Sequence, residues 1–355
     1  MRLTLLALCV AFATTNPALG AGAAYEADPV WLKLPEGRSE IGSMHGDIGL
    51  SAAGEVYISV EGSVKQRFAI LGPGPGIQVY STDGRYLRNV PDAPFDLHGF
   101  LIRQEPGGEF LYGVRLAGGT SVEDKSRAGL DRQVVIKMTL DGKVVMSIPA
   151  SGIPDDFKSK TRDGRTYLRL SGIAVAPNGD IYITDGYASD YLHRFDRNGR
   201  YIASFGGKQP PYGFNQLHKI LIDTRFEPVR LIGTDRQNSR LVHFSLDGKL
   251  LGVIATDFKR PASLALRGDY LAVGELAGGR IDILDKEGRI VAQVGVNAVA
   301  EGVGVNTTPP EQWKPGEVTA PHGLTFTPAG DLLATEFNLF GRVHRFVLQQ
   351  GPPSR

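Results

Sequence analysis

The sequence predicts an all-β protein folded as a six-bladed β-propeller. Residues 170–206 contain four short, mostly apolar segments separated by turn sequences, which is the content of one complete four-stranded blade. The same pattern recurs six times at intervals of roughly 45–70 residues, a spacing typical of propeller repeats. Glycine accounts for 45 of the 355 residues, which suits many tight turns and argues against long helices. We therefore expect one repeat-built domain rather than two or three separate ones.

Blade three shows the expected elements most completely. Its four strands are predicted at residues 173–176, 181–184, 191–196 and 201–205. Two of its turns contain Asn178-Gly179 and Asn198-Gly199, residue types that readily adopt the positive φ angles of tight turns. The loop between the second and third strands contains Tyr187, on which the functional interpretation depends.

The other five blades repeat the order of strand, glycine turn, strand, loop, strand and hairpin. They are predicted at residues 48–84, 100–142, 220–248, 264–288 and 324–346. Blade six has no fourth strand of its own after residue 346. We expect residues 30–34 to supply that strand and close the ring, so that no sheet edge stays open.

The first 20 residues are predicted to be a cleaved signal peptide. Arg2 precedes an apolar run at residues 3–13, and small residues follow near position 20. Cys9 is the only cysteine, so the mature protein would have no disulfide and would be held by its core. We expect a periplasmic or secreted protein. Its residues 21–355 would form a single propeller domain with insertions near residues 117–132 and 153–169.

The charge distribution excludes some classes of partner. The net charge is +1 and no basic stripe is present, which argues against nucleic-acid binding. The N-terminal apolar run is too short to span a bilayer, so no membrane span is expected. A small-molecule or peptide-derived substrate is the partner that we expect instead.

Three histidines occupy equivalent positions in alternate blades. Equivalent positions of the repeats in a propeller surround the same central axis. We therefore compared the residues that lie two positions before the first predicted strand residue of each blade. In blade order they are Gly46, His98, Ser171, His218, Ala262 and His322. Because the chain contains only seven histidines, three in one register with threefold spacing is a specific signal.

This register predicts a metal site on the axis. Three neutral imidazoles with one open coordination position fit Zn²⁺ in a catalytic site, so His98, His218 and His322 are the candidate ligands. The alternative is that each histidine sits at a strand end and forms hydrogen bonds within its own blade. For a single histidine that alternative is the better one, whereas three in register favour the metal.

The exits of the second strands face the same side of the ring and add two candidates. Tyr187 follows Asp185-Gly186 in blade three, and Arg236 follows Asp235 in blade four. Beside a bound Zn²⁺ and Arg236, the pKa of Tyr187 would fall far enough for the phenol to act as a general base. Alternatively, Tyr187 only lines the pocket with its hydroxyl in water. Asp185 and Asp235 are expected to hold their own loops by local hydrogen bonds.

Several of these segments resemble one enzyme family. Residues 183–190 (ITDGYASD), 214–218 (FNQLH) and 234–240 (TDRQNSR) are similar to blades of peptidyl-α-hydroxyglycine α-amidating lyase, a propeller of the NHL type. Residues 95–100 (FDLHGF) and 320–324 (APHGL) resemble its other two zinc-histidine segments. The resemblance implies that His98, His218 and His322 bind zinc. It also implies that Tyr187 is the base on the substrate hydroxyl and that Arg236 supports it.

The sequence departs from that family in its substrate clamp. The family arginine that meets the substrate carboxylate falls where this chain has Val60-Glu61, so Glu61, Arg67 and Arg115 are the candidate substrate-binding residues. A calcium-binding aspartate of the family is replaced by Gly323, and Asp47 is the candidate substitute for a structural Ca²⁺. The family cysteine after the tyrosine is Ala188, so its disulfide is absent.

These observations favour a secreted, zinc-dependent lyase that breaks a carbon–nitrogen or similar bond in an altered substrate. Hydrolysis by a metal-activated water, as in a hydrolase or lactonase on the same fold, is a related possibility. A different class of function is a non-catalytic NHL propeller that binds a peptide, glycan or protein, because propellers host many functions. Metal content separates the two classes, since a bare scaffold has no need of zinc on its axis.

Overall fold

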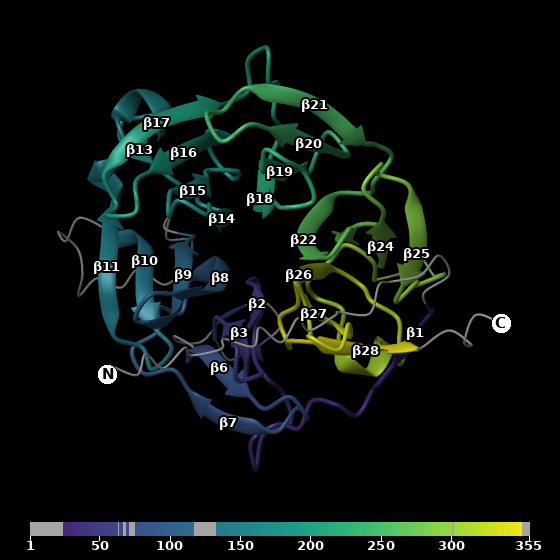
Figure 1. Ribbon diagram of the computed structural model, residues 1–355. Helices are drawn as coiled ribbons and strands as arrows, with labels where there is room; N and C mark the ends of the chain where they lie inside the picture. Colours follow the sequence, from purple (N-terminus) through teal and green to yellow (C-terminus); the bar gives the residue numbers. More distant parts are fainter. Residues whose placement is uncertain are drawn as a thin grey trace, which may run out of the picture.

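The computed structural model describes residues 24–62, 64–66, 69–70, 75–116, 133–299 and 302–349. Six four-stranded antiparallel sheets stand as blades around a central axis (Figure 1). One edge strand of each sheet lies at the axis and the opposite one at the rim (Figure 1). This arrangement confirms the predicted all-β, six-bladed β-propeller.

Each blade is ordered from axis to rim, and in blades one, two, four and five the outermost strand follows the hairpin at which the predicted range ends. Blade one consists of β2 (Ile48–Leu50), β3 (Val56–Val60), β6 (Gly76–Tyr80) and β7 (Tyr86–Asn89). Blade two consists of β8 (Leu97–Glu105), β9 (Gly108–Arg115), β10 (Gln133–Thr139) and β11 (Val144–Pro149). Blade three consists of β14 (Gly172–Val175), β15 (Ile181–Thr184), β16 (Tyr191–Phe195) and β17 (Tyr201–Gly206). Blades four and five consist of β18 (Leu217–Asp223), β19 (Arg230–Asp235), β20 (Arg240–Phe244) and β21 (Leu250–Ala255); and β22 (Pro261–Arg267), β23 (Tyr270–Glu275), β24 (Arg280–Leu284) and β25 (Ile290–Val294). Blade six contains β26 (Pro321–Phe326), β27 (Leu332–Glu336) and β28 (Val343–Gln349).

The hydrophobic core lies between neighbouring blades rather than within one. Each strand buries one face against the next sheet, and six clusters of buried apolar side chains fill the six gaps. Between blades three and four, for example, Tyr182 and Leu192 pack with Leu231 and Phe244. This packing fixes the inner strands rigidly, and those strands carry the axial residues.

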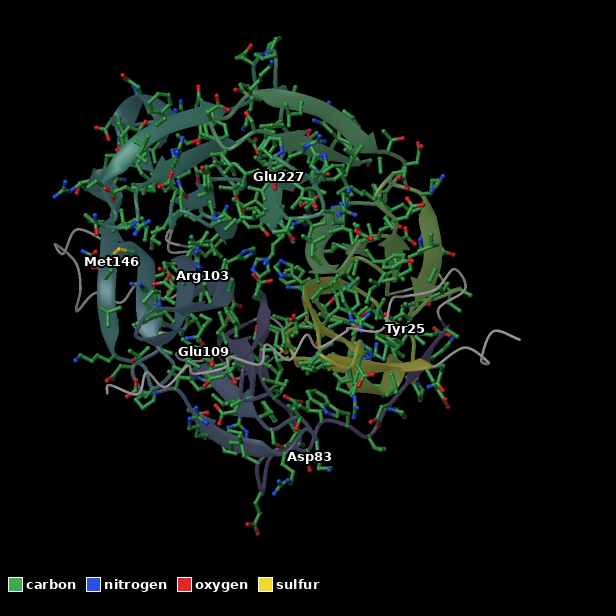
Figure 2. All side chains as sticks on the ribbon, viewed as in Figure 1. Tyr25, Asp83, Arg103, Glu109, Met146 and Glu227 are labelled. Carbon is green, nitrogen blue, oxygen red and sulfur yellow. The ribbon has the colours of Figure 1, made fainter. Side chains whose placement is uncertain are left out.

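The N-terminal strand closes the ring, but it is not the predicted one. β1 (Ala24–Ala27) pairs antiparallel with β28 and becomes the outer strand of blade six. Figure 2 shows Tyr25 of this strand beside blade six, where its hydroxyl donates to Gly330 O at 3.3 Å. The expectation for residues 30–34 was therefore wrong. Trp31 of that segment is buried against blade one instead, and its Nε1 donates to Thr82 O at 2.9 Å.

The connections include a few short elements. They are the hairpins β4 (Val64–Gln66) with β5 (Ala69–Ile70) and β12 (Ser159–Lys160) with β13 (Thr166–Tyr167), and the 3₁₀ turns η2 (Ala150–Gly152), η3 (Asp155–Phe157) and η4 (Pro310–Gln312). The predicted insertion at 153–169 thus contains η3 and the β12–β13 hairpin. The signal peptide at 1–20, the insertion at 117–132 and Arg67 lie outside the described residues. Among the described residues, no helix has the length and apolar character needed to cross a membrane.

Candidate active site on the propeller axis

The predicted histidines reach the axis because of a local irregularity in their strands. In β8 the pairing shifts between Leu97 and Gly99, so His98 has no partner on β9. The pairing of β26 shifts in the same way around His322, and that of β18 shifts across His218. An extra residue of this kind bends a strand and re-aims its side chain. Each of these three blades therefore aims one imidazole into the channel.

The structure brings all three predicted ligands together. The ring centroids of His98 and His218 are 5.0 Å apart, those of His98 and His322 are 4.8 Å apart, and those of His218 and His322 are 5.0 Å apart. Each residue is at most 2% exposed. Three imidazoles from strands more than 100 residues apart in sequence thus form a nearly equilateral triangle, as the repeat register predicts.

Backbone carbonyls orient two of the three rings. His98 Nδ1 donates to Ser171 O at 2.6 Å, and His218 Nδ1 donates to Ala262 O at 2.7 Å. Ser171 and Ala262 are the small residues at the same register in the next blade. A proton on Nδ1 leaves Nε2 of a neutral imidazole with a free lone pair, which is the arrangement found in metal-bound histidines.

His322 has a different environment. Both of its ring nitrogens are buried, and neither has a hydrogen-bond partner among the described residues. An unpartnered buried polar atom costs free energy, and two on one ring call for an explanation. A bound ion on the axis would satisfy at least one of them.

A fourth histidine belongs to the same cluster and was missed from the sequence. The ring of His45 lies 4.7 Å from that of His98 and 4.9 Å from that of His322. The ligand nitrogens of His45, His98 and His322 all lie within 4.8 Å of one another. The signal was present, because His45-Gly46 repeats the His-Gly pair of His98-Gly99 and His322-Gly323, shifted by one position.

Burial keeps these four axial histidines, His45, His98, His218 and His322, in the neutral form. It lowers the pKa of His98 to about 3 and holds the pKa of each of the other three well below its usual value. The positive charge of Arg236 lowers the pKa of all four in addition. The neutral imidazole is the form that binds a metal ion.

The residues present therefore fit a divalent transition metal. Imidazole suits Zn²⁺, the rings are neutral, and two of them are oriented by backbone carbonyls. Nitrogen ligands of one tetrahedral zinc ion lie about 3.3 Å apart, given zinc–nitrogen bonds of about 2.0–2.1 Å. The ligand nitrogens of His45, His98 and His322 lie up to 4.8 Å apart, so metal binding would draw these rings together.

The loop that carries Tyr187 is held by the aspartate that precedes it. Asp185 accepts hydrogen bonds from Arg169 N at 2.6 Å and from Ser189 N at 3.0 Å. A Cβ atom on Gly186 would lie 2.2 Å from Leu217 O, so only glycine lets this loop approach the next blade. The predicted structural role of Asp185 is confirmed. Asp235 has the same role, since it accepts from Asn215 N at 2.9 Å.

This loop places the phenol oxygen of Tyr187 among the imidazoles. Tyr187 Oη lies 2.7 Å from His218 Nε2, 3.1 Å from His98 Nε2 and 3.2 Å from His45 Nε2. Arg236 Nη1 donates to the same oxygen at 3.2 Å. The structure thus brings Tyr187 and Arg236 together with the histidine cluster.

The pKa of Tyr187 is raised because the residue is buried. The positive charge of Arg236 and its hydrogen bond lower this pKa, as the sequence suggested, but in the protein alone burial outweighs them. The expected fall in pKa therefore depends on a further positive charge next to the oxygen.

The predicted substrate-binding residues Glu61 and Arg115 lie in different environments. Glu61 lies at the site, with Oε1 3.8 Å from His45 Nδ1, and burial together with the charge of Asp96 raises the pKa of Glu61 to about 7. Arg115 instead forms an ion pair with Asp96, with Nε 2.7 Å from Oδ1. Arg115 is therefore already neutralised and is a weak candidate for binding a substrate anion.

Two further arginines reach the site and were not predicted. The guanidinium carbon of Arg169 lies 5.7 Å from the centre of the Tyr187 ring, and that of Arg236 lies 5.9 Å from it. Arg260 is close enough for its charge to interact with both Arg236 and Tyr187. Arg169 lies two positions before Ser171, and Arg260 lies two positions before Ala262. Ser171 and Ala262 occupy the same register position as the three predicted histidines, so both arginines enter the site from just before that position.

Asp47, the candidate calcium ligand, has a cationic partner from the chain itself. Its Oδ2 accepts a hydrogen bond from Lys219 Nζ in a buried ion pair and another from Phe100 N at 2.9 Å. Lys219 directly follows His218 in β18, so this ion pair lies next to the histidine cluster. The Lys219 ammonium therefore takes the place next to Asp47 that was predicted for a structural Ca²⁺.

The sequence matches no model of a known protein family. The probable peptidyl-α-hydroxyglycine α-amidating lyase pgal-1 of Caenorhabditis elegans is 27% identical to the chain over 107 residues. That match covers 29% of this chain and 28% of the relative, so the chain matches less than a third of that protein's length. The family therefore remains a resemblance.

Solved structures share the fold over most of the chain. A streptogramin B lyase superposes with a TM-score of 0.53 at 16% identity, covering 92% of this chain and 98% of its own. Virginiamycin B lyase from Staphylococcus aureus gives a TM-score of 0.52 at 13% identity, covering 88% and 99%. A protein of unknown function from Bacteroides thetaiotaomicron gives 0.57 at 12% identity, covering 92% and 76%. At these identities the comparisons establish the propeller fold alone.

Proposed function

We propose that this protein is a metal-dependent lyase that cleaves the carbon–nitrogen bond of an N-acyl-α-hydroxyglycine or a closely related carbinolamide. One observation carries the proposal: a buried phenol oxygen lies within 3.2 Å of three imidazole nitrogens and a guanidinium. A cluster of this kind joins a metal-binding set to a proton acceptor in a single site.

His98, His218 and His322 would hold the metal, for which Zn²⁺ is the best match to three imidazoles. When bound, the ion would act as a Lewis acid and stabilise negative charge on neighbouring oxygens. The carbonyls of Ser171 and Ala262 keep His98 and His218 in the orientation that presents Nε2 to the axis. His45 adds a fourth imidazole at the same point.

Tyr187 would move the proton of the reaction. Its Oη takes the proton of the substrate hydroxyl, the carbon–oxygen bond becomes a carbonyl, and the carbon–nitrogen bond breaks. The departing nitrogen leaves as an amide and receives the proton back from Oη. The products are an amide and an aldehyde such as glyoxylate, and no water is consumed.

Arg236 would favour the deprotonated form of Tyr187. Its Nη1 donates to Oη, and its charge lowers the pKa of the phenol. The burial of Arg236, which is 5% exposed, makes this interaction stronger than it would be in water. Arg236 therefore acts on the reacting atoms through Tyr187.

The names of similar proteins support a lyase. The curated relative is named a probable peptidyl-α-hydroxyglycine α-amidating lyase, and two structural neighbours are named streptogramin B lyase and virginiamycin B lyase. We further propose that the protein is exported by its N-terminal 20 residues. Cell fractionation of a full-length and a truncated chain tests this part independently.

The experiment is a turnover assay with N-benzoyl-α-hydroxyglycine, in which released glyoxylate is measured for wild-type protein loaded with zinc. We expect turnover that is lost in Tyr187→Phe and in His322→Ala but kept in His193→Asn, a buried histidine outside the site. A wild-type protein that binds zinc but releases no glyoxylate would refute the proposed reaction. A protein with neither metal nor turnover would favour the binding-scaffold alternative.

A further inference from the structure

Three successive blades each supply an arginine to the surroundings of Tyr187. Arg169 precedes β14 in blade three, Arg236 follows β19 in blade four, and Arg260 precedes β22 in blade five. Arg169 and Arg236 lie 5.7 and 5.9 Å from the Tyr187 ring centre. Arg260 interacts electrostatically with Arg236 and with Tyr187. Positive charge therefore gathers on the side of Tyr187 that is formed by blades three to five.

Arg169 and Arg260 occupy the same structural position in their blades. The carbonyl of Arg169 accepts from Tyr187 N at 3.3 Å, and the carbonyl of Arg260 accepts from Leu276 N at 3.1 Å. In both cases the donor lies just beyond the second strand of the same blade. Both arginine backbones are thus held against the segment that follows the second strand of their blade, and in blade three that segment contains Tyr187.

No carboxylate in the part of the chain that the structure describes neutralises these guanidinium groups. Arg169, Arg236 and Arg260 form no ion pair with a carboxylate of the described residues, and the Nε atom of each is buried without a hydrogen-bond partner. Two arginines at the starts of third strands are paired instead, Arg240 with Asp235 and Arg280 with Glu275. Glu61, whose Oε1 lies 3.8 Å from His45 Nδ1, comes from blade one, which is opposite blade four in the ring.

Unpaired charge at such a position costs stability, because like charges repel and burial removes water. The pKa of Arg260 is lowered by burial and by Arg236, which reflects this cost. A group of like charges that lowers the stability of the unliganded protein is expected where a bound ligand supplies the opposite charge. Arginine is suited to this role because its planar fork matches the two oxygens of a carboxylate.

We propose that Arg169 and Arg260 form a carboxylate clamp that selects substrates with an anionic group next to the carbon whose hydroxyl Tyr187 deprotonates. The clamp rests on the proposed function, because it assigns the binding of the substrate to the same pocket. It places the anion on the side of blades three to five. Glu61 on the opposite side then faces the uncharged or hydrogen-bond-donating part of the substrate.

The test compares two probes that differ only in charge, N-benzoylglycine and N-benzoylglycinamide. Binding of each to zinc-loaded protein is measured by titration calorimetry at low ionic strength. The test variant is Arg169→Gln/Arg260→Gln. The charge-matched control is Arg162→Gln/Arg200→Gln, because both of these arginines are exposed and neither contacts the residues of the site. A further variant, Arg169→Lys/Arg260→Lys, keeps the charge but removes the planar fork.

We expect N-benzoylglycine to bind wild-type and control protein at least tenfold more tightly than it binds the glutamine variant, with the lysine variant in between. N-benzoylglycinamide should bind all four proteins equally and weakly. Wild-type protein that fails to prefer the carboxylate, or a glutamine variant that binds it as well as wild type, would overturn the clamp. Carboxylate-selective binding without glyoxylate release would refute the proposed reaction and leave the clamp intact.

The glutamine variant also has a readout that does not depend on any ligand. Removing two unpaired guanidiniums should leave the denaturation midpoint unchanged or raise it at low ionic strength, and added salt should shrink the difference. A lower midpoint than that of the control variant would show that the arginines stabilise the fold, and would count against a binding role.

Discussion

Asp47 and Lys219 form a buried ion pair across the propeller, although they are 172 residues apart in the sequence. Asp47 precedes β2 in blade one, and Lys219 lies on β18 in blade four. The pair therefore joins opposite blades of the ring next to the histidine cluster.

Breaking this pair should destabilise the fold. Asp47→Asn leaves a buried ammonium without its counter-ion, which typically costs about 3–5 kcal/mol. The double variant Asp47→Asn/Lys219→Met should recover most of that loss, because it removes both charges. Chemical denaturation measures both values. A double variant no more stable than Asp47→Asn alone would show that the pair is not the cause.

A buried histidine outside the site should make the fold sensitive to acid. Burial, and to a lesser extent the charge of Lys158, lowers the pKa of His193 to about 3, against 6.5 in an unfolded chain. Between these two values the unfolded state binds more protons, so stability falls as the pH drops from about 6.5 towards 3. The full effect is on the order of 5 kcal/mol, given about 1.4 kcal/mol per pKa unit.

The matched variant for this prediction is His193→Asn, which can keep the hydrogen bond that Nδ1 makes with Ser204 Oγ at 2.7 Å. Denaturation midpoints measured from pH 7 to pH 4 should fall less steeply for the variant than for wild type. Parallel curves for the two proteins would contradict the assignment of this acid sensitivity to His193.

Most of the fold is predictable from the sequence because a propeller repeats its pattern. Each blade has its own glycine turns and alternating strands, so an error in one blade is corrected by the others. The closing strand has no such support. Residues 30–34 are more apolar than residues 24–27, yet the rim strand of a blade is half exposed, and the apolar Trp31 is buried against blade one instead.

The site was only partly predictable, for a geometric reason. A single register located His98, His218 and His322 because their strands shift pairing at the same point. His45 lies one position before the register residue of its blade, Gly46. Arg169 and Arg260 each lie two positions before the register residue of theirs, so a search at that one position misses all three. The sequence also gives no indication that Arg115 is neutralised by Asp96, because that pairing depends on side-chain packing.

Tyr187→Phe should separate catalysis from metal binding. The substitution keeps the ring but removes the oxygen that contacts His218 and Arg236. If Tyr187 is the proton acceptor, kcat should fall by roughly 10²–10⁴, while zinc content stays the same. Glyoxylate release and elemental analysis measure the two quantities on one preparation. Full turnover by the variant would remove Tyr187 from the mechanism.

Single variants should also identify the third ligand among the axial histidines. His98 and His322 belong both to the predicted triad and to the cluster that includes His45. His218→Gln should lose zinc and His45→Gln should retain it, because a backbone carbonyl orients the His218 ring for binding. Zinc competition with a chelating dye measures both affinities. The reverse result would place His45, rather than His218, in the metal site.

Zinc content of wild-type protein, His322→Ala and His193→Asn after loading and desalting tests the central claim most directly. His322 has no other hydrogen-bond partner among the described residues, so its loss should affect the metal before it affects the fold. The account predicts about one zinc per chain in the wild-type and His193→Asn proteins and almost none in His322→Ala. A wild-type protein without zinc, or a His322→Ala protein that retains it, would contradict a metal-dependent function for this axis.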